Sequence, residues 1–208
     1  MAFMVIIFHS AIRNFGLGPL FILMGSLQFF LIILTSNVYN IYFDKFIFSP
    51  GAIVLFTSNL FCILLVFHTE SIKKVRSMIY GLLFANVAVT LLSYISLQQI
   101  YIDNQSKNIE FIKNVFNYDV NIFLVGTLLL YLDSIILIIL YEVMNYKFKT
   151  KYLFFKIFIP VSVVCLFDSV VFYSLNYYAE DNFVDLIISN IIGKQITVFF
   201  FSLAIYIY

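Results

Sequence analysis

The sequence predicts an all-α integral membrane protein, a six-transmembrane-helix bundle with a short N-terminal interfacial helix. Hydrophobic residues make up 63% of its 208 residues and charged residues only 11%, whereas soluble domains carry about 25% charged residues. Six apolar stretches fill almost the whole chain, and a membrane span needs about 20 apolar residues. Lipid is therefore the expected solvent, and the net charge of +1 argues against nucleic acid as a partner.

Two segments of unequal size are expected: an N-terminal amphipathic or interfacial segment, 1–18, and a membrane domain, 19–208. Residues 1–8 are apolar, but no basic region precedes them and no small-residue cleavage site follows, so they make a poor signal peptide. Residues 1–15 are expected to form a short interfacial or partly buried helix. The run Gly16-Leu17-Gly18-Pro19 should end it, because glycine and proline interrupt a helical pattern.

The six predicted spans are connected by four short loops and one longer polar loop, 99–119. Pro50 lies one residue before the second span and suits a helix start. That span is short, and we expect Phe46 to Phe48 to extend it. The predicted spans are 19–38, 51–67, 78–98, 120–141, 154–176 and 186–208.

The distribution of lysine and arginine predicts the orientation, because cytoplasmic loops carry an excess of these residues. Eight fall on one side of the predicted topology: Arg13, Lys73, Lys74, Arg76, Lys147, Lys149, Lys151 and Lys156. Three fall on the other: Lys45, Lys107 and Lys113. The expected location is therefore the inner (plasma) membrane, multi-pass, with both termini cytoplasmic.

Polar groups near the middle of the spans give the strongest indication of function, because ionisable residues at bilayer depth are costly. Asp168 in the fifth span and Lys194 in the sixth both lie roughly 12 Å below the outer edge at the α-helical rise. These two spans run antiparallel, so we expect the two side chains to lie close together and to face the interior of the bundle.

Helical spacing groups further polar residues with them. Asn190, Lys194 and Thr197 share one face of the sixth span, and Asn86 shares a face of the third span with two hydroxyl residues. Such faces should point into the bundle, where partners are available. We therefore expect a polar cavity that opens outward. Its candidate substrate-binding residues are Asp168, Lys194, Asn190, Asn86, Asn59 and Asp133.

A purely structural role is the alternative for several of these residues. Asp168 and Lys194 could simply neutralise each other and hold two helices together, since a buried ion pair gains little beyond its desolvation cost. For Asp133, a structural role and a binding role are equally expected. Gln28 and Asn59 are more simply explained by hydrogen bonds that bridge helices.

No motif for chemistry is present, so the sequence does not predict an enzyme or a cofactor. It lacks a glycine-rich phosphate loop, a zinc-binding histidine–glutamate pattern and a nucleophile elbow. Cys62 and Cys165 lie inside apolar stretches and are interpreted as small core residues. His9 and His68 fall near membrane edges without ligand-spaced neighbours, so no metal site is expected.

Four short motifs occur along the predicted spans. They are Ser49-Pro50-Gly51 at the start of the second span, the basic turn from Lys73 to Arg76, Phe167-Asp168-Ser169, and the lysine of Gly193-Lys194 before a phenylalanine-rich run. Together they resemble the motifs of the VUT family of vitamin-uptake or queuosine-precursor transporters. The resemblance covers roughly 19–208. It implies an architecture similar to the substrate-binding components of ECF-type vitamin importers and the uptake of a small heterocyclic solute. On this basis Asp168 would contact the ligand or ion and Lys194 would balance its charge.

Three functions are open as hypotheses. The first is a solute-binding or uptake transporter domain for a queuosine-precursor-like or vitamin-like compound. The second is a membrane-embedded sensory input domain of a bacterial signalling protein that continues beyond residue 208. The third is a structural membrane subunit. The expected partners are the lipid bilayer, a small-molecule solute, and a cytoplasmic signalling domain or further copies of the chain.

Overall fold

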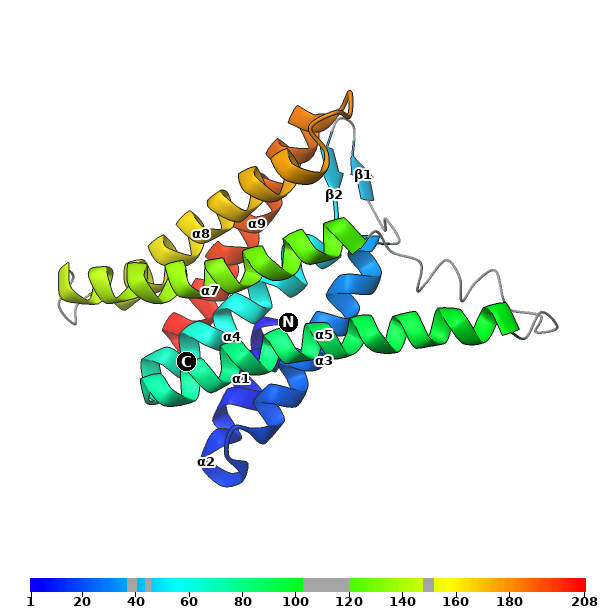
Figure 1. Ribbon diagram of the computed structural model, residues 1–208. Coiled ribbons are helices and arrows are strands. Elements are labelled where there is room, and N and C mark those ends of the chain that lie inside the picture. The colour runs from blue at the N-terminus through cyan, green and yellow to red at the C-terminus, as the bar shows by residue number, and fades with distance from the viewer. Residues whose placement is uncertain (37–40, 44–45, 103–119, 148–151) are drawn as a thin grey trace.

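A computed structural model describes residues 1–36, 41–43, 46–102, 120–147 and 152–208. Most of them are helical, as predicted, and the long helices form one bundle (Figure 1). Five segments are long and apolar enough to cross a membrane. They are Gly51–Thr69, Ile72–Ser96, Asn121–Lys147, Leu153–Asn176 and Phe183–Ile207.

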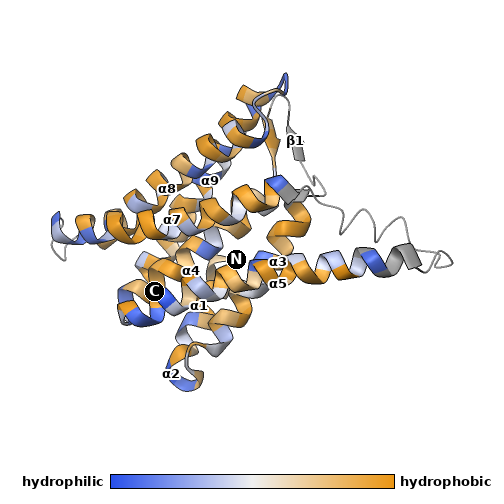
Figure 2. Ribbon diagram, viewed as in Figure 1, coloured by the Kyte–Doolittle hydropathy of each residue, from blue (hydrophilic) through white to orange (hydrophobic). Residues whose placement is uncertain are grey.

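The first predicted span corresponds to helix α3 (Gly18–Ser36). Its apolar part, Gly18–Leu34, is shorter than each of the five membrane-spanning segments given above. The structure thus confirms a helical membrane protein and five of the predicted spans by length and composition, while the first span, 19–38, stays a prediction. Hydrophobic residues make up most of the length of the long helices, which suits a lipid environment (Figure 2).

The N-terminal segment packs on the bundle as two short helices, α1 (Ala2–Ser10) and α2 (Ile12–Phe15). α1 contacts α3, α4 and α9, and its Val5 and His9 are buried. The chain turns at Gly16, whose φ of 68° lies in the left-handed region that glycine adopts without steric cost. α3 begins two residues later, so the predicted break falls where expected.

Residues 41–48 differ from the prediction, because they include a strand pair. β1 (Ile41–Phe43) and β2 (Phe46–Phe48) run antiparallel, with Ile41 opposite Phe48. Phe46–Phe48 therefore does not extend the second span. Proline disfavours helix at the residue before it, so Pro50 separates this extended segment from the helix that follows.

The second span lies at the centre of the molecule. It begins as the π-helical turn η1 (Gly51–Leu55) and continues as α4 (Phe56–Thr69). Every residue from Phe56 to Val66 is buried, because α4 contacts α1, α3, α5, α7, α8 and α9. α4 is thus a core helix enclosed by protein.

The remaining helices surround α4. They are α5 (Ile72–Ile102), α7 (Val120–Lys147), α8 (Leu153–Asn176) and α9 (Phe183–Ile207). α8 packs most extensively against α9 and α7. α5 continues past the predicted start of the long loop, most of which lies outside the described residues.

Candidate ligand-binding site

Asp168 on α8 and Lys194 on α9 form a salt bridge inside the bundle. Their side chains are only 9% and 2% exposed. The prediction that these two residues meet and face the interior is therefore confirmed. The Lys194 ammonium also lies 4.3 Å from the ring centroid of Phe56, so a carboxylate and an aromatic face both stabilise its charge.

A hydrogen-bonded layer lies beside the ion pair. Ser169 donates to Asn190 Oδ1 at 2.9 Å, and Asn190 Nδ2 donates to the Tyr173 hydroxyl at 3.3 Å. Asn190 is 1% exposed. Both ends of its amide are thus held by α8, which fixes the orientation of the side chain beside the ion pair.

A cavity of about 280 Å³ opens beside these groups, which is slightly below the usual range of about 300–1,000 Å³ for ligand pockets. α8 and α9 contribute Asp168, Asn190 and Lys194 to its wall. Aromatic and apolar side chains form most of the remainder. The lining residues are Gln28, Leu31, Ile32, Ala52, Phe56, Ile122, Phe123, Gly126, Thr127, Leu130, Asp168, Phe172, Tyr173, Tyr177, Asn190 and Lys194.

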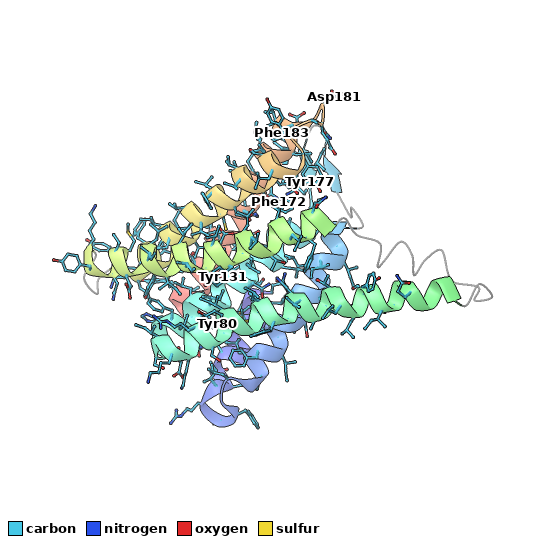
Figure 3. The ribbon with its side chains drawn as sticks, viewed as in Figure 1. Tyr80, Tyr131, Phe172, Tyr177, Asp181 and Phe183 are labelled. Atoms are coloured by element: carbon cyan, nitrogen blue, oxygen red, sulfur yellow. The ribbon has the colours of Figure 1, made fainter. Side chains whose placement is uncertain are left out.

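The cavity lies toward one end of the bundle. Tyr177 directly follows the last residue of α8, Ile122 belongs to the first turn of α7, and Ala52 lies in the π-helical turn. Phe172 and Tyr177 lie at the end of α8 near the strand pair, while Tyr131 lies farther along α7 (Figure 3). This end is the one that the lysine and arginine distribution assigns to the outside.

α9 packs closely against η1 and β2 at Gly193, next to the lysine of the ion pair. A Cβ atom added at Gly193 would lie 2.5 Å from Ile53 Cδ1 and 3.3 Å from a ring carbon of Phe48. The absence of a side chain at Gly193 lets α9 approach the π-helical turn and β2. Lys194 is the next residue, so this approach helps to set the depth of its side chain.

Two of the predicted wall residues lie elsewhere. Asn59 is fully buried and donates to Gln28 Oε1 at 3.1 Å, which is the helix-bridging hydrogen bond expected for this pair. Asn86 donates to Thr127 at 3.3 Å and lines a separate, much smaller cavity between α5 and α7. The expectation that Asn59 and Asn86 line the main cavity is therefore not met.

Asp133 on α7 lies behind the wall of the cavity. It is 0% exposed, it is not a lining residue, and it interacts electrostatically with Asp168 and Lys194. The structure thus places a second carboxyl group beside the ion pair, although it gives this group no direct access to the cavity.

Sequence reasoning did not assign the aromatic part of the site. Phe56, Phe172 and Tyr173 contribute rings to the wall, and Gln28 contributes an amide in addition to bridging helices. Aromatic residues are too frequent in this chain to single these out, since 20% of its residues are aromatic. Within the described segments, no three histidine, cysteine or acidic residues gather as metal ligands.

Comparison with known proteins adds the family. A model of the vitamin uptake-like sensor family matches residues 1–208. The chain belongs to this family. The match confirms the resemblance to vitamin-uptake-like membrane domains inferred from the short motifs, and it extends over the N-terminal segment as well. No curated protein and no solved structure gave a match to the chain.

Proposed function

We propose that the chain is a membrane-embedded receptor domain that binds a small heterocyclic compound and acts as a sensory module. The observation that carries this proposal is the cavity of about 280 Å³, which combines a buried ion pair with aromatic walls. A structural ion pair alone would be expected in a closely packed core, whereas this pair borders open space. The family name, which refers to a sensor, supports the same direction.

The chemistry of the wall favours a planar, polar heterocycle. Aromatic rings provide flat surfaces for stacking, and Phe56, Phe172 and Tyr173 supply such surfaces. Gln28 and Asn190 present amides, while Asp168 can pair with a ligand cation. A queuosine-precursor-like or vitamin-like compound meets these requirements. Binding of this kind involves no chemical step, so the proposal does not include enzymatic activity.

The proposal includes a membrane arrangement. The domain lies in the inner (plasma) membrane with six spans, α3 being the first, and with both termini cytoplasmic. The distribution of lysine and arginine supports this orientation. The cavity then faces outward, and a cytoplasmic partner domain or a further copy of the chain would receive the signal.

Uptake of the same compound is the second candidate function. The observation that favours it is the position of the ion pair in the cavity wall, away from the ends of α8 and α9, because transporters bind their substrates near the bilayer midplane. Both functions share the cavity, but a sensor passes on a signal after binding, whereas a transporter moves the compound across the membrane. Reconstituted vesicles with labelled compound distinguish them, since only a transporter accumulates the compound inside.

A binding screen tests the proposal. The purified protein is incubated with purines, deazapurines and vitamins, and its thermal unfolding is recorded. A compound at about 100 times its Kd should stabilise the protein by about 2.7 kcal/mol. Stabilisation by one heterocyclic class, and its loss in Asn190→Leu, is the expected result. If no heterocycle stabilises the protein but lipids or other compounds do, the proposed ligand class is wrong.

A further inference from the structure

We propose that Asp133 and Asp168 form a proton-binding site, in which one proton is held between their carboxyl groups while Lys194 neutralises the remaining charge. Asp133 lies on α7, Asp168 on α8 and Lys194 on α9, so three helices meet at this site. The site belongs to the resting protein and needs no ligand in the cavity.

Burial of both carboxyl groups is the first observation. Taken as whole residues, Asp133 is 0% exposed and Asp168 is 6% exposed. The other acidic side chains that the structure describes are at least partly exposed. An isolated carboxylate is strongly disfavoured away from water. Each of these two groups therefore requires either a cation, hydrogen-bond donors or a proton.

The supply of donors at the site is the second observation. Lys194 forms its salt bridge with Asp168. Among the described residues, no donor hydrogen-bonds to either oxygen of Asp133, yet Asp133 interacts electrostatically with Asp168 across the packed helices α7 and α8. Two neighbouring carboxyl groups attract each other only if a proton lies between them, since ionised carboxylates are acceptors alone.

The balance of charge leads to the same conclusion. One ammonium group neutralises one carboxylate, and two close carboxylates cannot both remain ionised at little cost. With one proton on the pair, the three side chains are neutral overall, and the protonated group donates to the ionised one.

The surroundings contain few groups that would alter this balance. Within the described part of the chain, the charged groups that act on Asp133 are Asp168 and Lys194, and the buried thiol of Cys165 on α8 is a further titratable neighbour of the cluster. α4 and α5 also pack against α7. Titratable side chains that the structure describes on these two helices include Cys62, His68, Lys73, Lys74, Arg76 and Tyr80. None of them is among the groups that act on Asp133.

Infrared spectroscopy of the purified protein tests the site directly. A protonated carboxyl group has a carbonyl stretch that is separate from the carboxylate and amide bands and that shifts in heavy water. Exposed carboxyl groups, with ordinary pKa values near 4, do not contribute to it at neutral pH. We expect the parent protein to show this band, and we expect Asp133→Asn to lose it. Asp185→Asn, which changes an exposed carboxyl group on α9, should retain it.

A second measurement removes the dependence on variants. Aspartate labelled with a heavy isotope at its carboxyl carbon should shift the band of the parent protein. Absence of the band at neutral pH overturns the proposal. Persistence of the band in a folded Asp133→Asn variant overturns it as well. Because no ligand is added, failure here is distinct from failure of the binding screen.

Discussion

The cluster of Asp133, Asp168 and Lys194 leads to a prediction about how its substitutions combine. Asp133→Asn should change the free energy of unfolding by less than about 1 kcal/mol, because an asparagine amide can donate to Asp168 as a protonated carboxyl group does. Asp168→Asn removes the salt-bridge partner of a lysine whose side chain is 2% exposed. Loss of one partner from a buried pair costs about 3–5 kcal/mol.

The cost of Asp168→Asn should nevertheless fall below that range. Once Asp168 is neutral, Asp133 can release its proton and pair with Lys194, so the lysine regains a carboxylate. The double variant, Asp133→Asn with Asp168→Asn, removes this alternative and should show the full loss of about 3–5 kcal/mol. The double variant should therefore cost more than the sum of the single variants, by about 0.5–3 kcal/mol for interacting neighbours.

Equilibrium unfolding in mixed detergent micelles, followed by circular dichroism, measures these differences. Asp181→Asn is the matched control, because Asp181 is an exposed carboxyl group in the turn between α8 and α9. Two results would refute the reasoning. In one, Asp133→Asn is as destabilising as Asp168→Asn. In the other, the double variant equals the sum of the two single variants.

The other predictions concern regions away from this cluster. Burial lowers the pKa of His9 from its ordinary value of 6.5. Below about pH 6.5 the unfolded chain therefore binds more protons than the folded protein, and the stability should fall as the pH decreases. His9→Gln should flatten this pH dependence in thermal unfolding, and an unchanged slope would contradict the prediction. Gly193→Val should destabilise the protein by about 1–3 kcal/mol because its side chain would overlap Ile53, and unfolding as in the parent would show that α9 moves freely. Asp181→Cys should react with a membrane-impermeant thiol reagent only from outside and Lys74→Cys only from inside, and the reverse pattern would overturn the proposed orientation.

The sequence predicted the ion pair because depth along a helix is easily estimated. Asp168 and Lys194 lie at similar depths on consecutive antiparallel helices, and few other groups at that depth could satisfy them. The sequence does not determine in the same way how far each helix is rotated about its axis, and this rotation decides which neighbour a polar side chain faces. Asn59 and Asn86 are buried as expected, but they point toward Gln28 and Thr127 and leave the cavity to other residues.

The remaining features depend on tertiary packing. Phenylalanine and tyrosine occur on lipid-facing, interfacial and cavity-facing surfaces alike. Hydropathy therefore cannot show that Phe56, Phe172 and Tyr173 belong to the cavity wall. The strand pair was also missed, since Phe46–Phe48 is as apolar as the helix that follows. The proximity of Asp133 to Asp168 required the packing of α7 against α8.

The central claim, that the cavity is a ligand-binding site, is tested most directly by filling it. Gly126 lies in the cavity wall, where an added Cβ would be 3.6 Å from the Phe172 ring, while Gly81 on α5 has open space around it. Gly126→Leu and Gly81→Leu insert the same side chain into equivalent helical backbone. The heterocycle that stabilises the parent should still stabilise Gly81→Leu by about 2.7 kcal/mol at 100 times its Kd, and it should no longer stabilise Gly126→Leu. Equal stabilisation of both variants would show that the compound binds elsewhere.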